Sequence, residues 1–176
     1  MAFEYMDACA LTITPYMGLD VLLALEPWMK KGRGVYCVFY SSNKNGHSVQ
    51  EKTFGSHTIA QCFLEDYHNH LTKTNLRENF GIVVGAQHLK NKDKTACDIL
   101  NNYCYLVPGV GAQGAVIDKA VKGHFLANTS DLISISRSLV GFGDKESEPR
   151  LKKISSFMEY QNFVQEKVDF YHQQLF

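Results

Sequence analysis

Five short stretches of the chain consist almost entirely of apolar residues, and longer stretches with recurring polar residues separate them. We predict strands at residues 10–14, 34–40, 80–84, 103–107 and 132–136. The segments between them favour helices at residues 19–25, 56–71, 90–101 and 115–126. Strands that are apolar along their whole length and alternate with helices are typical of a parallel sheet covered on both faces. The pattern therefore predicts an α/β fold.

A final helix is predicted from about residue 149 to residue 176. Apolar residues recur there at spacings of three and four, which places them on one face of a helix: Phe157, Tyr160, Val164, Val168, Tyr171 and Leu175. Pro149 suits the first turn of such a helix, because its missing N–H would have no partner there. We expect the stripe to pack in the core and residues 1–176 to form a single domain.

Polar residues and glycines gather where the predicted strands end. Residues 15–20, 41–46 and 85–88 each follow one strand and include Asp20, Ser42 and His88. The carboxyl ends of parallel strands meet at one edge of a sheet, and ligands bind at that edge in open α/β sheets and in (β/α)8 barrels. We therefore expect the functional site there.

The most distinctive of these loops is Pro108-Gly109-Val110-Gly111-Ala112-Gln113-Gly114. Glycines leave backbone N–H groups free to face a ligand, and a helix that follows such a loop presents its N-terminus to an anion. Arg137 comes directly after the next predicted strand. Its guanidinium can pair with a phosphate that the glycine loop holds.

The composition limits the classes of partner. The chain has 18 Lys and Arg against 18 Asp and Glu and no basic run, which gives no reason to expect nucleic acid or a membrane surface. No apolar run approaches the roughly 20 residues of a membrane span, and the first residues do not resemble a signal peptide. We expect a cytoplasmic protein. The five cysteines are odd in number and scattered, so we expect reduced, mostly buried thiols.

Five motifs follow one another along the chain: Thr12-Ile13-Thr14-Pro15-Tyr16-Met17-Gly18-Leu19-Asp20, Ser41-Ser42-Asn43, Val83-Val84-Gly85-Ala86, residues 108–114 and Ser136-Arg137-Ser138. In their order and approximate spacing they resemble the orotidine 5′-phosphate decarboxylase family, in particular its longer subclass found in some bacteria and in apicomplexan parasites. The resemblance runs from about Asp7 to Phe142. It implies a (β/α)8 TIM-barrel fold, present here in part as about five βα units that correspond to strands four to eight.

The resemblance also implies roles for individual residues. Ser42 would hydrogen-bond the pyrimidine, Pro108 would line its pocket, Gln113 would reach the phosphate, and Arg137 would pair with the phosphate dianion. The family converts OMP to UMP and CO2 without a cofactor, by stabilising a carbanion at C6, and draws on the remote phosphate for transition-state stabilisation. Its sites lie at a dimer interface, which implies a homodimer here.

One family motif is absent from this sequence. The chemistry depends on an Asp-x-Lys-x-x-Asp motif, and no Asp-x-Lys occurs in the chain. We therefore assign no catalytic residue here, and expect the chain alone to bind the nucleotide phosphate poorly and not to decarboxylate. A complete barrel takes about 250 residues, which also predicts that three strands are missing. Three explanations stay open: a truncated sequence, a fragment completed by another chain, or a shorter protein that closes its sheet by oligomerising.

Other candidates carry weaker signals. Gln50 lies in the loop after residue 43 and is a candidate lid or phosphate contact. Asp20 is a candidate helix N-cap, and His88 is most simply a loop histidine. His68 and His70 lie two apart on a predicted helix and do not share a face, so we expect an exposed polar helix and no metal site.

Two further functions are alternatives to the decarboxylase. A non-catalytic nucleotide-binding or assembly module would keep the phosphate loop and lack the Lys and Asp array. A dinucleotide-dependent oxidoreductase would use Gly109, Gly111 and Gly114 as a G-x-G-x-x-G fingerprint. That fold expects an acidic residue at the end of the following strand, where this chain has Arg137 instead.

Overall fold

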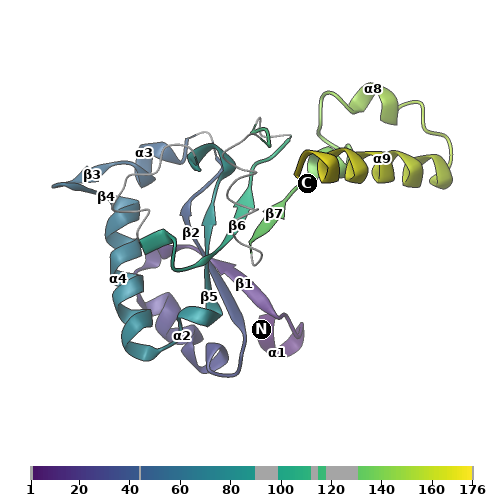
Figure 1. The fold of residues 1–176 in the computed structure, drawn as a ribbon. Helices are drawn as coiled ribbons and strands as arrows, with labels where there is room; N and C mark the ends of the chain where they lie inside the picture. The colour runs from purple at the N-terminus through teal and green to yellow at the C-terminus, as the bar shows by residue number, and fades with distance from the viewer. Residues whose placement is uncertain (1, 44, 90–98, 112–114, 118–130, 176) are drawn as a thin grey trace.

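The computed structural model describes residues 2–43, 45–89, 99–111, 115–117 and 131–175. Five parallel strands form one sheet in the order β1-β2-β5-β6-β7, with bounds close to those that the sequence predicts. They are β1 (Ala10–Ile13), β2 (Gly34–Tyr40), β5 (Phe80–Val84), β6 (Cys104–Pro108) and β7 (Leu132–Ser134). A small antiparallel ribbon, β3 (Thr53–Phe54) and β4 (His57–Thr58), stands apart from this sheet (Figure 1).

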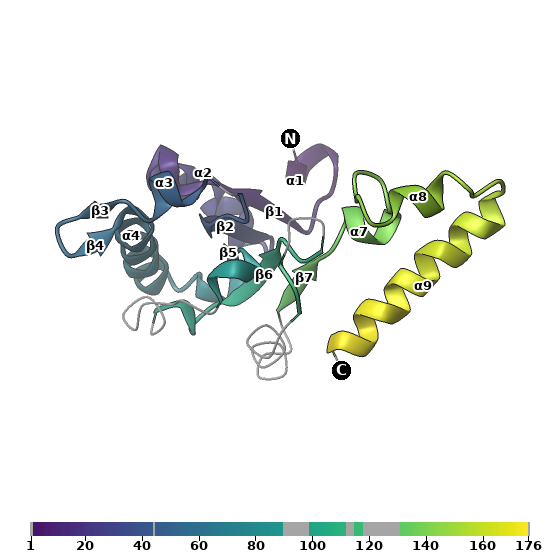
Figure 2. The same cartoon turned by 90° about the horizontal axis from the view of Figure 1, so that it is seen from above.

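The helices connect and flank these strands. They are α1 (Ala2–Tyr5), α2 (Asp20–Met29), α3 (His47–Gln50), α4 (Ile59–Thr74), α7 (Arg137–Val140), α8 (Glu148–Leu151) and α9 (Phe157–Leu175), with single 3-10 turns η1 (Pro15–Met17), η2 (Arg77–Asn79) and η3 (Ala86–His88). Helices α2 and α4 lie on one side of the sheet, whereas α7, α8 and α9 lie beyond β7 (Figure 2). The sheet with its helices is a curled half-barrel, a partial TIM-barrel, as the sequence predicts.

The core lies between the sheet and its helices. On β2, Val35, Cys37 and Phe39 are fully buried and alternate with Tyr36, Val38 and Tyr40, which are only partly buried. Successive residues of a strand point to opposite faces, so one face of β2 is completely covered and the other is not. The covered face packs against α4, where the ring of Tyr67 meets Phe39 edge-on at 5.7 Å.

Helix α4 is capped at both ends by its own sequence. Thr58 and Gln61 form a capping box, in which each side chain accepts a hydrogen bond from the backbone N–H of the other residue. Asn75 ends the helix in the left-handed conformation, at φ 57°. Asparagine tolerates that conformation better than most residues, which explains where the helix stops.

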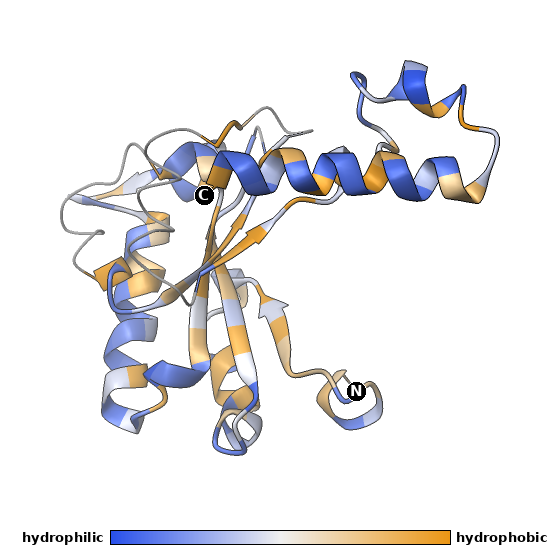
Figure 3. Ribbon diagram, turned by 45° about the vertical axis from the view of Figure 1, so that its right-hand side comes forward, coloured by the Kyte–Doolittle hydropathy of each residue, from blue (hydrophilic) through white to orange (hydrophobic). Residues whose placement is uncertain are grey.

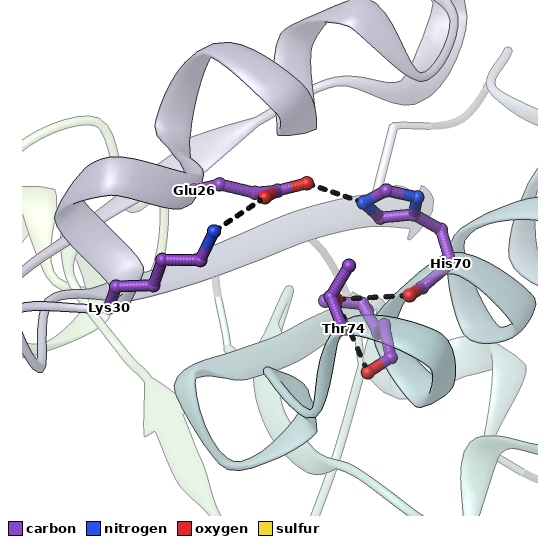
Figure 4. Close-up of polar contacts among 5 residues, drawn as sticks. Glu26, Lys30, His70 and Thr74 are labelled. Carbon is purple, nitrogen blue, oxygen red and sulfur yellow. Dashed lines mark hydrogen bonds and ion pairs between the residues drawn. The ribbon is translucent and has the colours of Figure 1, made fainter.

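A polar contact joins α4 to α2 outside the apolar core (Figure 4). The Nε2 atom of His70 lies 2.5 Å from one carboxylate oxygen of Glu26, and Lys30 Nζ lies 3.3 Å from the other. Thr74 on α4 donates to the carbonyl of His70 at 3.0 Å. The hydrogen bond with His70 is the largest cause that holds the pKa of Glu26 below its ordinary value. Glu26 therefore links the two helices that cover the sheet.

The last predicted helix is divided in the structure. Residues 149–176 were expected to form one helix, but α8 ends at Leu151 and α9 begins at Phe157. The expectation that its apolar stripe packs in the core is confirmed only in part. Phe157 is 75% exposed and Val168 is 41% exposed, whereas the other four stripe residues are partly buried. The buried residue of α9 is Phe163, which lies outside the predicted stripe. Figure 3 shows hydrophobic and hydrophilic residues mixed along this helix.

Three smaller expectations also differ from the structure. Asp20 is the first residue of α2, and Leu19 is its N-cap without a side-chain hydrogen bond. Residues 115–117 are not helical, and the rest of the helix predicted at residues 115–126 lies outside the described residues. His68 and His70 are half-buried rather than exposed, because His68 Nδ1 lies 2.9 Å from the Tyr103 hydroxyl and His70 contacts Glu26.

The described cysteines differ in their surroundings. Cys9, Cys37, Cys62 and Cys104 are free thiols. Cys37 is buried as expected, and burial raises its pKa, but Cys9 is exposed. No helix among the described residues is both long and apolar enough to cross a bilayer.

Candidate functional site

Ser41, directly after β2, is held by side chains from two other loops. Its backbone N–H donates to Oε1 of Gln50 at 3.0 Å. Its carbonyl oxygen accepts from Gln87 Nε2 at 3.2 Å and lies 3.1 Å from His88 Nε2. A carbonyl oxygen can only accept, so the Nε2 atom of His88 carries the proton in this contact. Ser41 is therefore fixed mainly by side chains at the point where β2 leaves the sheet.

Glycines allow these loops to approach closely. A Cβ at Gly85 would lie 2.9 Å from the Cα of Ser42, closer than non-bonded carbon atoms come, and Gly85 N donates to the Tyr40 carbonyl at 2.7 Å. A Cβ at Gly46 would lie 3.0 Å from Gln50 Oε1. The ends of β2 and β5 are thus packed backbone against backbone beside Ser42.

The loop after β1 joins the same group. Burial raises the pKa of the Tyr16 hydroxyl, and a hydrogen bond with Gln50 offsets part of that rise. Gln50 is itself only 4% exposed. One buried amide therefore connects the loops that follow β1 and β2, and Ser41 connects them to the loop after β5.

The glycine loop after β6 folds back on itself. Gly109 and Gly111 have φ angles of 101° and 81°, in the region that glycine adopts readily. The N–H of Gly111 donates to the Ala115 carbonyl at 2.8 Å, and the Ala115 N–H donates to the Gly109 carbonyl at 3.3 Å. The sequence suggested free N–H groups in this loop, but the N–H of Gly111 is already used within it.

The same loop forms one wall of a groove of about 840 Å³. Arg137 and Ser138, after β7, also line this groove, and α9 contributes Phe170 and Tyr171 to it. A Cβ at Gly111 would lie 2.7 Å from the Tyr171 hydroxyl and would overlap the Ser138 Oγ atom. The groove lies in the size range of small-molecule sites, about 300 to 1,000 Å³.

The charges around this groove favour an anion. Four basic residues line it, Arg137, Lys145, Arg150 and Lys167, together with the acidic residues Asp144, Glu146 and Glu166. Glu166 is paired with Arg150 at 2.6 Å, and Asp144 accepts from the Ser147 hydroxyl at 2.5 Å. Among the described residues Arg137 has no ion-pair partner, so its guanidinium is available to a ligand.

The residues predicted from the sequence lie along one edge of the sheet. Ser42 follows β2, Pro108 ends β6 in register with Ser134 of β7, and Arg137 begins α7. Gln50 is buried against Ser41. Gln113 lies outside the described residues, which flank it at Gly111 and Ala115 on the groove wall.

Sequence reasoning missed two residues at this edge. Ser138 is 3% exposed and touches the glycine loop, and Tyr171 reaches the same loop from α9. Ser138 lies beside Arg137 within a quoted motif, which was a signal for it. Tyr171 was assigned to a core stripe, and nothing local to α9 indicates its contact with residue 111.

The described residues of the five sheet strands include no carboxylate, histidine or lysine. Tyr36 lies on the partly buried face, where burial raises its pKa to about 12, and the Cys104 thiol donates to its hydroxyl at 3.7 Å. Tyr36 is therefore neutral near pH 7. No cluster of three metal-binding side chains occurs among the residues that the structure describes.

A parallel half-barrel with a groove beside the loops that follow β6 and β7 defines the class of this protein: a partial (β/α) barrel. The chain is homologous to the orotidine 5′-phosphate decarboxylases, and the resemblance seen in its motifs is confirmed. The proteins of that name from Roseiflexus sp. and Natronomonas pharaonis are 32% and 34% identical to it, each over 79% of the chain. The chain spans about half the length of these curated relatives, 50% and 49%.

Solved structures give the same result for the fold. The chain is similar to the Leishmania donovani UMP synthase, with a TM-score of 0.60 and 25% identity over 86% of this chain and 34% of the other. It is also similar to the Plasmodium berghei orotidine 5′-monophosphate decarboxylase, with a TM-score of 0.59 and 20% identity over 93% and 51%. No protein-family profile matches the chain.

Proposed function

We propose that this chain supplies the phosphate- and pyrimidine-binding part of an orotidine 5′-phosphate decarboxylase, a carboxy-lyase of pyrimidine biosynthesis that converts OMP to UMP and CO2. The observation that carries the proposal is the groove that has both Gly111 and Arg137 on its walls. Arg137 pairs with the phosphate, and Gln113 donates to it. Ser42 and Pro108 take the pyrimidine side. No cofactor takes part.

Two further parts of the proposal concern the cell and the assembly. The relatives' name describes an enzyme of nucleotide metabolism, which fits a cytoplasmic protein. A homodimer is proposed on the same homology. Gln50 remains a candidate lid or phosphate contact only if it leaves its buried position beside Ser41.

A second function is favoured by one observation. The sequence holds no Asp-x-Lys-x-x-Asp, so a non-catalytic nucleotide-binding module is the alternative. Both functions require a pyrimidine nucleotide to bind the groove. They differ in whether decarboxylation of orotidine 5′-phosphate appears when this chain is combined with a segment that carries the Asp-x-Lys-x-x-Asp motif.

The test measures UMP binding by isothermal titration calorimetry. We expect the wild-type chain to bind UMP weakly and Arg137→Gln to weaken binding at least about tenfold further, because the variant loses a charge-assisted hydrogen bond to phosphate. Arg77→Gln is the matched control, since Arg77 is exposed and lies outside the groove. Equal affinities of the wild-type chain and Arg137→Gln would contradict the proposal. Turnover of orotidine 5′-phosphate by the chain combined with a segment that carries the Asp-x-Lys-x-x-Asp motif would eliminate the non-catalytic alternative.

A further inference from the structure

Both backbone polar groups of Ser41 are bonded to side chains from other loops. The N–H is bonded to Gln50, and the carbonyl is bonded to Gln87 and His88. These three residues are here called the Ser41 clamp. Ser41 comes immediately before Ser42, so the clamp fixes the peptide from which the side chain of Ser42 projects.

Gln50 is the buried member of the clamp. Burying a side-chain amide without hydrogen bonds is costly, and the position is stable because Oε1 of Gln50 accepts from Ser41 and its side chain bonds to Tyr16. Gly46 leaves the space that the amide occupies. These contacts tie Gln50 inward to the strand ends.

His88 holds the carbonyl side. Its ring packs against Tyr40 with centroids 5.6 Å apart, Nε2 faces the Ser41 carbonyl, and Nδ1 lies 3.5 Å from Glu51 Oε1. Glu51 follows Gln50 directly, so the two halves of the clamp are joined through α3 and its next residue. Because Gln50, Gln87 and His88 all hold Ser41, the backbone at Ser41 is pre-organised. Pre-organisation reduces the entropy that is lost when a ligand binds.

We propose that Gln50 and His88 are positioning residues that set Ser42 for recognition of the pyrimidine ring. The inference rests on the proposed function, because Ser42 meets the base only if the site takes a pyrimidine nucleotide. Ser42 and Arg137 are carried by different loops, after β2 and after β7. Loosening the clamp therefore reduces affinity for the base and leaves affinity for the phosphate intact.

The test uses Gln50→Met, which fills a similar volume and removes the acceptor of the Ser41 N–H. We expect the Ser41 amide to exchange with solvent about tenfold faster in the variant, measured by NMR, while the amide of Cys37 in β2 is unchanged. We expect affinity for UMP to fall about tenfold and affinity for ribose 5-phosphate, which lacks the base, to change less than twofold. Gln173→Met, at an exposed position of α9, is the matched control.

Two further variants test whether the effect of Gln50→Met comes from the lost hydrogen bond or from a general loss of folding. Gln50→Glu keeps an oxygen acceptor for Ser41 and is expected to retain amide protection. His88→Phe keeps a ring against Tyr40, removes the donor to the Ser41 carbonyl, and is expected to lower UMP affinity selectively. Circular dichroism checks that each variant is folded.

The outcomes separate the two proposals. If the wild-type chain does not bind UMP, the proposed function fails, and unchanged exchange of the Ser41 amide in Gln50→Met then overturns the clamp as well. If the wild-type chain binds UMP but Gln50→Met and His88→Phe bind it equally well, the clamp is overturned and the proposed function stands. A parallel loss of UMP and ribose 5-phosphate affinity also overturns it.

Discussion

At the scale of single residues, Gly111 shows how a small side chain decides the shape of the groove. Its φ of 81° favours glycine, and its missing Cβ leaves room for Ser138 and Tyr171. The positive φ and the lack of space for a Cβ are two separate constraints on residue 111. Comparison with Gly32 separates their effects. Gly32 has a similar φ of 85° but has no atom within 4 Å of where its Cβ would be.

We therefore expect Gly32→Ala to lower the free energy of unfolding by about 1 kcal/mol, the cost of an L-residue in the left-handed region. Gly111→Ala should cost about 3 kcal/mol, because steric overlap with Ser138 adds to that strain. It should also abolish UMP binding. Urea denaturation of both variants measures the difference. Equal losses of stability would show that the contact with Ser138 is unimportant.

At the scale of secondary-structure elements, the contact between Glu26 and His70 joins α2 to α4. The pKa of Glu26 is lowered in the folded chain, chiefly by the hydrogen bond from His70 and with help from Lys30. A carboxyl group with a lowered pKa contributes stability above its unfolded pKa of about 4.5 and loses that contribution as pH falls below it.

Glu26→Gln is therefore expected to lower the free energy of unfolding by up to about 1 kcal/mol at neutral pH. The difference from the wild-type chain should shrink toward zero as the carboxyl group is protonated below pH of about 4. Urea unfolding across this range measures it. Glu78→Gln, at an exposed position, is the control, and a pH-independent effect of Glu26→Gln would argue against the ionic contact.

The strands were the most predictable elements. β2 and β5 have the predicted bounds, because runs of β-branched and aromatic residues bounded by turn residues are specific to buried strands. The break before α9 was missed because apolar spacing continues through Leu151 and Ile154. A local signal existed: Ser156 and Glu159 match a capping box, and Glu159 N donates to Ser156 Oγ at 3.2 Å.

The candidate site was predictable only in part. Position in the chain placed Ser42, Pro108 and Arg137 after strand ends, because all parallel strands end at the same edge. The bond from Ser41 to Gln50 follows from how α3 folds back over β2, and the contact of Tyr171 with the glycine loop follows from where α9 lies. Both contacts depend on tertiary packing, which cannot be predicted from the spacing of residues in the sequence.

At the scale of the whole molecule, the described sheet ends at β1 on one side and at β7 on the other. Leu132 on β7 is 51% exposed, and Tyr36 and Val38 on the inner strand β2 are only partly covered. Strand edges next to exposed apolar side chains are ready to pair with another chain.

We expect the isolated chain to associate in a concentration-dependent manner, measured by sedimentation velocity. Leu132→Lys should reduce this association, because a charge on an edge strand opposes pairing. Val49→Lys is the control, since Val49 is 48% exposed but belongs to α3 and not to the sheet. A wild-type chain that stays monomeric at all concentrations would contradict the expectation.

The groove is lined both by loops at the strand ends and by α9, so the last helix of the chain is part of it. Under the proposed function, an anion paired with Arg137 lies in the groove that α9 also lines, so its binding would hold the C-terminal helix against the half-barrel. Coupling of this kind is reciprocal: a ligand that steadies the helix is itself held less tightly whenever the helix is loosened. On that proposal, changes in α9, the last nineteen residues described, would alter affinity at a loop some sixty positions earlier in the sequence.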